Sequence, residues 1–301
     1  MSLEAAASQG RHVDALPLLD WKVPVAHNSY TRRDTAFYAL SIGLGHDPLN
    51  ERQFKFIDPW NPKLVALPSM ALVLGYPGFW LGDERVCKAT GLRPTEILHV
   101  EQAIELHAAL PVQAAVVGST SVTGLVDKGK ERGCLLYSER AVHLADSGVR
   151  LATCRQVHYL RGCGGFGDTG FMAPSSNIKP NGAPVKVLDS TTRPEQALLY
   201  RLNGDANALH FDPRTAADAG MPRPILHGMA SMGMVGYALL AALLDDDPSR
   251  MQSMSLRMTG PIFPGDTLRT EIWENGAFRT RALERNLVVI DYGHVTVRHL
   301  D

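Results

Sequence analysis

The sequence predicts an α+β protein built from two similar units, in which long antiparallel strands curl around an apolar helix. Each half of the 301-residue chain has a helical segment, then a long apolar run, then several long β-type runs. The run from Gly228 to about Leu244 is apolar on all sides, so a helix there has to be buried. Asn275-Gly276 is a strong hairpin signal between two β-type runs. These three observations carry the prediction.

In the first half, Thr31 caps a predicted helix that runs to Leu40. Leu67-Pro68-Ser69-Met70 leads into an apolar run that ends at Gly75-Tyr76-Pro77, and we interpret this run as the long helix of the first unit. The β-type runs follow near residues 97–106, 112–126, 133–144 and 149–160. We assign residues 1–161 to this unit.

A Gly- and Pro-rich stretch, 162–195, is interpreted as the connection to the second unit, 196–301. In the second unit, Asp212, Pro213 and Gly220 mark the start and end of a short helix, so Asp212 is predicted to be a capping residue. The long apolar helix is stopped by the aspartates 245–247 and Pro248. Strands are predicted at 254–258, 267–273, 277–283 and 287–297.

Composition and charge exclude several classes of protein. The chain is 45% hydrophobic and 20% charged, as in ordinary globular proteins. Lys and Arg total 30 against 31 Asp and Glu, so the balanced charge argues against nucleic-acid binding. The longest apolar stretch, 229–244, is too short and too rich in glycine to span a bilayer. We therefore expect no nucleic-acid partner and no membrane partner.

The four cysteines lack Cys-x-x-Cys spacing and are expected to be reduced thiols: Cys87, Cys134, Cys154 and Cys163. The N-terminal residues do not match a secretory signal, and the C-terminal His-Leu-Asp does not match the peroxisomal Ser-Lys-Leu type. These features predict a cytoplasmic enzyme.

Asp205, Asn207 and His210 bring a carboxylate, an amide and an imidazole together within six residues, just before a helix start. They are not at helical spacing, so an irregular loop can direct them at one point, as acid–base chemistry on one water requires. Turn capping and packing would explain each residue singly. The cluster, flanked by apolar Leu202, Leu209 and Phe211, favours a catalytic interpretation.

Gly228 follows Pro224-Ile225-Leu226-His227 and opens the long helix. Its backbone N–H is one of the unpaired donors at the positive end of the helix dipole, and glycine permits close approach of a ligand. Such a donor can stabilise a carbonyl oxygen that gains negative charge during reaction. Close helix packing is an equally good explanation of the glycine. We interpret His227 as a packing residue or as a residue that supports the site.

Other chemistries fit the sequence less well. No His-x-x-x-His or His-Glu-x-x-His spacing supports a metal site, so no metal is expected. Gly162-x-Gly-Gly-x-Gly lacks the remainder of a phosphate-binding motif, and no Gly-x-Ser-x-Gly nucleophile motif is present.

The chain resembles the 2-enoyl-CoA hydratase 2 group, the MaoC-like hydratases. The resemblance extends from about residue 30 to residue 297. It is centred on two segments, Tyr200-Arg201-Leu202-x-Gly204-Asp205-x-Asn207-x-Leu209-His210-x-Asp212-Pro213 and Pro224-Ile225-Leu226-His227-Gly228. In the first half it includes Leu67-Pro68-Ser69, Leu98-His99-x-Glu101-Gln102 and Gly164-Gly165-Phe166-Gly167. The family usually has proline where this chain has Ala208.

This resemblance implies a double hot-dog fold and a homodimer. It implies the reversible hydration of trans-2-enoyl-CoA to (3R)-3-hydroxyacyl-CoA, in fatty-acid or related acyl-CoA metabolism, with no cofactor beyond the coenzyme A of the substrate. Asp205 and His210 would be the catalytic pair, Asn207 would help to hold the water, and the Gly228 N–H would bind the thioester oxygen. Glu101 is a further candidate for the site. The first half would shape the acyl pocket.

Two alternatives remain at this point. A hot-dog acyl-CoA thioesterase would hydrolyse the thioester with a carboxylate-activated water. A non-catalytic acyl-CoA-binding subunit would need no complete set of site residues, and the presence of Asp205, Asn207, His210 and Gly228 argues against it. The form without a fused dehydrogenase is expected in bacteria.

Overall fold

In the part of the chain that the structure describes, the strands form one antiparallel sheet. The computed structural model describes residues 13–174, 178 and 180–298, so the expectations about the two chain ends lie outside the described residues. The strand order is β1-β3-β4-β5-β2-β7-β10-β9-β8-β6. The strands are β1 (Ala26–Tyr30), β2 (Ile97–Leu106), β3 (Ala114–Asp127), β4 (Cys134–Leu144), β5 (Arg150–Leu160), β6 (Lys186–Thr191), β7 (Met251–Met258), β8 (Thr267–Ile272), β9 (Ala277–Ala282) and β10 (Leu287–Val297).

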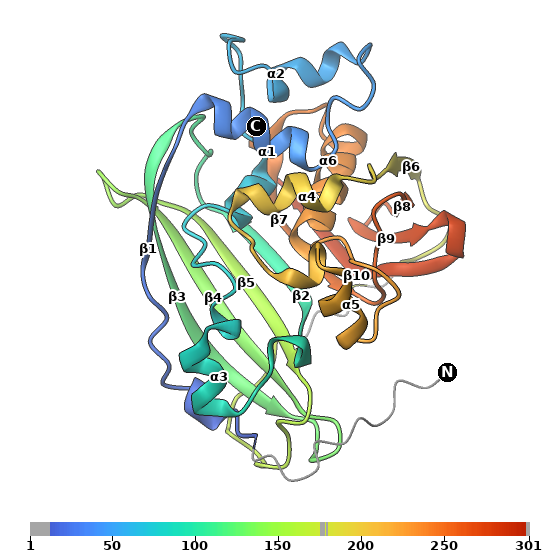
Figure 1. The fold of residues 1–301 in the computed structure, drawn as a ribbon. Helices are drawn as coiled ribbons and strands as arrows, with labels where there is room; N and C mark the ends of the chain where they lie inside the picture. Colours follow the sequence, from blue (N-terminus) through green and yellow to red (C-terminus); the bar gives the residue numbers. More distant parts are fainter. Residues whose placement is uncertain (1–12, 175–177, 179, 299–301) are drawn as a thin grey trace.

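The two halves of the chain meet at β2 and β7. The pairs from Glu101↔Arg257 to Glu105↔Ser253 join these strands in the middle of the sheet. Figure 1 shows the first-half strands as a broad curved surface on the left and the second-half strands on the right, with helices across the top. The two predicted antiparallel sheets are therefore continuous edge to edge.

The second half contains the predicted buried helix, α6 (Gly228–Leu243). A side chain at Gly233 would meet Ile42 and Tyr38, and one at Gly236 would meet Met254 of β7, so the glycines allow close packing on both sides. Tyr38 belongs to α1 (Arg32–Ser41), which begins after Thr31 as predicted. The remaining helices are α2 (Phe54–Ile57), α3 (Glu84–Thr90), α4 (Gln196–Tyr200) and α5 (Pro213–Asp218).

The long apolar helix predicted for the first half is wrong. A short 3₁₀ turn, Pro68–Leu72, occupies this part of the chain. The segment then reaches Gly75, whose φ of +58° belongs to the left-handed region that ends a helix. The apolar residues of this turn are nevertheless buried, so the run is part of the core.

Residues 162–195 contain strand β6, which pairs with β8 at the edge of the sheet. The Asn275-Gly276 turn joins β8 to β9, so the predicted hairpin is confirmed. Among the described residues, no helix has the length and apolar character needed to cross a membrane.

Candidate active site

The loop between α4 and α5 presents Asp205 and His210 through a series of local turns. Gly204 adopts a φ of +107° and ends the helical segment before it. The Asp205 carboxylate accepts a hydrogen bond from the Asn207 N–H (3.1 Å), and the Asn207 side chain accepts one from the Leu209 N–H (3.1 Å). These turns fix the loop without a regular helix. Asp212 caps α5 through the Arg214 and Thr215 amides, as predicted.

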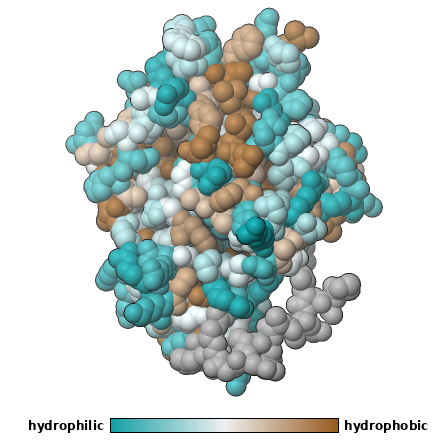
Figure 2. Space-filling model, viewed as in Figure 1, coloured by the Kyte–Doolittle hydropathy of each residue, from teal (hydrophilic) through white to brown (hydrophobic). Residues whose placement is uncertain are grey.

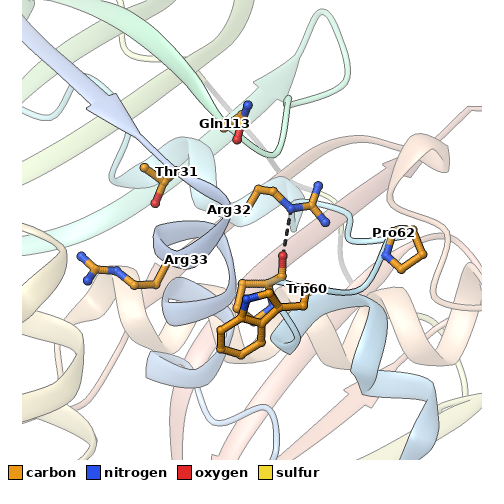
Figure 3. Close-up of a pocket in the computed structure, with 7 residues that line it drawn as sticks. Thr31, Arg32, Arg33, Trp60, Pro62 and Gln113 are labelled. Atoms are coloured by element: carbon orange, nitrogen blue, oxygen red, sulfur yellow. Dashed lines mark hydrogen bonds between the residues drawn. The ribbon is translucent and has the colours of Figure 1, made fainter.

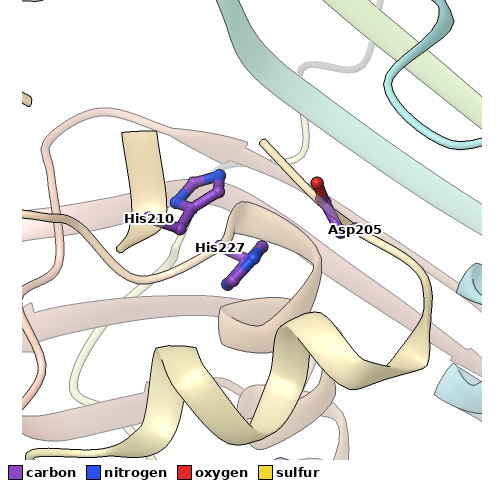
Figure 4. Close-up of side chains that lie close together, drawn as sticks. All are labelled: Asp205, His210 and His227. Carbon is purple, nitrogen blue, oxygen red and sulfur yellow. The ribbon is translucent and has the colours of Figure 1, made fainter. Parts of the chain in front are cut away.

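Asp205 and His210 converge with His227, from the N-cap of α6 (Figure 4). One polar side-chain atom from each residue lies within 4.8 Å of the others. Exposed fractions are 8% for Asp205, 9% for His210 and 1% for His227. A carboxylate and two imidazoles are thus held together and are largely buried.

The hydrogen bonding of His210 fixes its tautomer. Its Nδ1 lies 2.9 Å from the carbonyl oxygen of Ile225, which can only accept, so Nδ1 carries the hydrogen. Burial lowers the pKa of His210, although the negative charge of Asp205 opposes the shift. The neutral ring therefore has a lone pair available on Nε2.

His227 packs on His210, in agreement with the interpretation of this residue from the sequence. The two rings are stacked with centroids 3.8 Å apart and an angle of 27°. Neither nitrogen of His227 has a partner in good hydrogen-bond geometry among the described residues. Burial holds the pKa of His227 well below its usual value, so this ring is also uncharged at neutral pH.

A cavity of about 290 Å³ opens beside these residues. Asp205, Asn207, His210 and Gly228 all line it, so four of the five predicted site residues share one cavity. A side chain at Gly228 would lie 2.2 Å from Met258 Sδ and 3.4 Å from His99 Nδ1. Glycine at position 228 therefore avoids crowding with Met258 and His99 at the N-terminus of α6.

Glu101, the fifth candidate, is not among the described residues that line this cavity. Its carboxylate instead pairs with Arg257 at 2.7 Å, across the junction of β2 and β7. His99, two residues earlier, faces the cavity in its place.

Sequence reasoning missed the residues that the first half contributes to the cavity. The polar ones are Tyr76, His99, Gln156, His158 and Arg161. Gln156 and His158 are two positions apart on β5, so they share one face of the strand. This spacing can be read from the sequence, but only the fold shows which cavity that face meets.

Asp205, His210 and His227 carry side-chain groups that can ligate a metal ion. Their arrangement is better suited to hydrogen bonding with a water molecule. The two imidazoles are stacked, so their in-plane lone pairs run side by side and do not converge on one ion. Two partners of one water are separated by about 4.6 Å when each hydrogen bond is about 2.8 Å long. One ligand atom of Asp205 and one of His210 lie no more than 4.8 Å apart, which is compatible with one shared water.

A second hollow, of about 590 Å³, lies at the start of α1 (Figure 3). Arg32 donates from Nε to the Pro59 carbonyl at 2.9 Å, and the exposed indole of Trp60 forms one wall. Its seven lining residues include no carboxylate and no imidazole. The hollow therefore offers no acid–base pair.

Similar proteins were found for both halves of the chain. A model of the MaoC-like domain matches residues 176–297, and a model of the MFE-2 hydratase 2 N-terminal domain matches residues 28–162. The chain is 35% identical to the peroxisomal enoyl-CoA hydratase 2 of Arabidopsis thaliana, over 94% of this chain and 95% of that protein. It is 36% identical to the enoyl-CoA hydratase ChsH3 of Mycobacterium tuberculosis, over 88% and 90% of the two chains.

Solved structures of similar proteins have the same fold. The MaoC-like dehydratase of Phytophthora capsici superposes with a TM-score of 0.80 at 30% identity, covering 94% of this chain and 98% of that one. A Mycobacterium tuberculosis protein with a double hot-dog fold superposes with a TM-score of 0.56 at 15% identity, covering 92% and 97%. The predicted α+β double hot-dog class is confirmed. The chain belongs to the enoyl-CoA hydratase 2 family, the MaoC-like hydratases that the sequence motifs indicated.

Proposed function

We propose that this protein catalyses the reversible hydration of trans-2-enoyl-CoA to (3R)-3-hydroxyacyl-CoA. The observation that carries the proposal is the Asp205–His210 pair, buried at a cavity that also contains the N-terminal glycine of α6. Relatives of near-equal length are named enoyl-CoA hydratases, in agreement with this chemistry. The acyl-CoA ester is the substrate, and the proposal requires no metal and no further cofactor.

In the proposed mechanism, the thioester oxygen binds the Gly228 N–H, which draws electron density away from C3. Asp205 and His210 hold one water between the carboxylate and Nε2. One of the pair takes a proton as the water oxygen bonds to C3, and a proton is returned to C2 on the same face. Asn207 holds the loop through its bond to the Leu209 N–H, which keeps the pair aimed at the water.

Replacement of the catalytic carboxylate tests this proposal. We expect Asp205→Asn to fold normally and to lose at least about a hundredfold in turnover, because the amide cannot accept a proton. The assay follows enoyl absorbance together with free thiol. Asp218→Asn, at the exposed end of α5, is the matched control and should keep full activity. Near-normal hydration by Asp205→Asn would refute the assignment, and thiol release would identify a thioesterase instead.

We further propose a homodimer that uses the face over α1 and α4. Figure 2 shows apolar side chains gathered in a band at the upper middle of this face. Leu198 of α4 and the nearby Leu202 are 52% and 69% exposed, which is typical of an interface. Leu198→Asp should give a monomer in size-exclusion chromatography with light scattering. An unchanged mass would place any interface elsewhere.

The compartment proposed for the protein is the cytoplasm of a bacterial cell. The four cysteines are free thiols, three of them buried, as is typical of a reducing environment. Its relatives include a peroxisomal plant protein and a bacterial one. Fractionation of the source cells, with the protein detected by antibody, tests this location.

A further inference from the structure

The glycine-rich loop that follows β5 is locked to the hairpin between β3 and β4. The carboxylate of Asp127 accepts hydrogen bonds from the Gly165 N–H at 2.8 Å and from the Gly167 N–H at 2.6 Å. A Cβ at Gly164 would lie only 2.2 Å from the carbonyl oxygen of Gly129. The glycines therefore allow the loop and the hairpin to pack backbone against backbone.

This loop has little capacity to bind a phosphate itself. Phosphate-binding loops direct several backbone N–H groups at the anion. Here the Asp127 carboxylate already accepts from such groups, so the protein supplies its own anion. What the locked loop fixes is the residue before it, Arg161, whose N–H donates to the Glu96 carbonyl at 3.0 Å.

Among the described residues, Arg161 is the only lysine or arginine that lines the cavity of the active site. It is half-buried, and its guanidinium has no hydrogen bond and no ion pair with another described residue. By contrast, Arg257 pairs with Glu101 across the junction of β2 and β7. A cation without a partner at a cavity is available to an anionic group of a ligand.

The position of Arg161 along the chain shows which end of the substrate it meets. Gln156, His158 and Arg161 line the cavity in this order. Gln156 is 8% exposed and contacts the buried Met229, so it marks the inner end. Arg161 follows the end of β5 and precedes the exposed Gly162. The acyl chain therefore belongs at the inner end, and the coenzyme belongs at the outer end.

The distance from the reacting centre suits the phosphates of the coenzyme. His158 stacks on His99, which lies beside Gly228, the residue that binds the thioester oxygen in the proposed mechanism. Arg161 is three residues beyond His158, about 10 Å at about 3.3 Å per residue, and its long side chain adds to this reach. The pantetheine arm is about as long as four extended residues, about 14 Å, and the phosphates follow it.

We propose that Arg161 binds a phosphate group of the coenzyme A moiety, at a mouth of the cavity that the glycine-rich loop holds in shape. The inference rests on the proposed hydratase function and adds a binding residue to it. Arginine suits this role because its planar guanidinium can form two parallel hydrogen bonds to a phosphate. A carboxylate at the far end of an acyl chain is the other anion that this cation could meet, but that end of the substrate lies toward Gln156.

Removal of the charge tests the inference. We expect Arg161→Gln to raise KM for an enoyl-CoA ester at least about tenfold with little change in kcat, because the lost charged hydrogen bond is to a part of the substrate that does not react. Arg161→Lys retains the charge and should recover part of the affinity. Arg33→Gln removes an exposed charge at the second hollow and is the control, with an unchanged KM. An unchanged KM in Arg161→Gln would overturn the inference.

Truncated substrates show which group the arginine meets. Enoyl-pantetheine thioesters lack the nucleotide and its phosphates, so Arg161→Gln and the parent protein should hydrate them with equal KM. Esters of dephospho-coenzyme A, which lack only the 3′-phosphate, then distinguish that phosphate from the pyrophosphate. The inference would be wrong if Arg161→Gln weakened the pantetheine ester as much as the full ester. It would also be wrong if the variant weakened only esters with a carboxylate at the end of the acyl chain.

Binding of free coenzyme A, measured by calorimetry, separates this inference from the hydratase function. The parent protein should bind coenzyme A about tenfold more tightly than Arg161→Gln does, and the difference should shrink at high salt. A protein that binds coenzyme A through Arg161 and hydrates no ester would refute the hydratase function alone. A working hydratase whose affinity for coenzyme A is the same in Arg161→Gln would refute the phosphate site alone.

Discussion

Two acidic residues in this chain show how the environment separates their roles. Asp205 is 8% exposed and lies beside two neutral imidazoles, whereas the Glu101 side chain is 31% exposed and pairs with Arg257. Burial places Asp205 against the imidazoles at the cavity, whereas Glu101 pairs with an arginine near the surface. A motif in the sequence gives the residue type, and the fold decides the role.

The Glu101–Arg257 pair is expected to act on stability and not on proton transfer. Because the pair is substantially exposed, its coupling energy should be below about 1 kcal/mol. Glu101→Gln, Arg257→Gln and the double variant, unfolded in urea, form the cycle that measures it. The pH profile of hydration should be the same in Glu101→Gln as in the parent protein. A displaced profile would mean that the carboxylate takes part in the reaction.

The site residues that could be predicted from the sequence are those held by local structure. Asp205, Asn207 and His210 belong to one loop, and Gly228 marks a helix start, so short-range rules are enough to identify them. His99 and His158 are 59 positions apart and meet only because β2 pairs with β5. Such a contact depends on strand pairing, which no local pattern specifies.

At the level of elements, the start of α6 depends on the absence of a side chain at Gly228. In Gly228→Ala, the new methyl group would displace Met258, because its carbon would lie only 2.2 Å from the Met258 sulfur. Alanine favours the helix, so stability should change little. We expect kcat/KM for the enoyl ester to fall by about a hundredfold, because the substrate is displaced from the site.

A second substitution tests whether the activity loss in Gly228→Ala is caused by the displacement of Met258. Adding Met258→Ala to Gly228→Ala removes the displaced side chain and should recover much of the lost activity. Full activity in Gly228→Ala alone, or no recovery in the double variant, would contradict this account of the helix start.

The wrong prediction of a long helix in the first half is explained by the packing of this segment. An apolar run can be a buried helix or an irregular buried segment, and periodicity alone does not distinguish the two. Here Gly75 turns the chain and packs directly on Gly118 of β3, while its N–H donates to the Asn28 side chain at 2.9 Å. This contact between distant segments overrides the helical preference of the run.

Gly118 is therefore predicted to be intolerant of substitution. A Cβ at this position would lie 1.9 Å from the carbonyl oxygen of Gly75, and both atoms are fixed to the backbone. We expect Gly118→Ala to lower the free energy of unfolding by about 2–3 kcal/mol, measured by urea denaturation. Ser119→Ala, at the next and exposed position, should change it little. Equal stabilities of the two variants would show that the two segments can separate easily.

At the scale of the whole molecule, each half of the chain contributes part of the cavity. The second half supplies the acid–base pair and the helix terminus, and the first half supplies the opposite wall of the same cavity. The continuous pairing of β2 with β7 fixes the distance between these two walls. The repeat of helices and strands predicted two units, but it could not predict that one cavity would belong to both.

Three histidines line this shared cavity and a fourth, His227, is stacked on one of them. Burial lowers the pKa of all four: His99, to about 4, and His158, His210 and His227. In the unfolded chain each would titrate near pH 6.5. Below that pH the unfolded state binds protons that the folded state does not, so stability falls as the pH falls. Each histidine contributes about 1.4 kcal/mol per pH unit until its own folded pKa is reached.

The expected outcome is a steep loss of unfolding free energy between pH 6.5 and pH 4, measured by urea denaturation across the range. The hydrogen-bonded carboxylates with lowered pKa, such as Asp34 and Asp212, lose their contribution only below about pH 4, so this window reports the histidines. His158→Leu removes one titrating group and should reduce the slope by about 1.4 kcal/mol per pH unit. Constant stability down to pH 4.5 would mean that the folded protein accommodates protonated imidazoles at the cavity. The conclusion that burial keeps these four histidines uncharged would then be wrong.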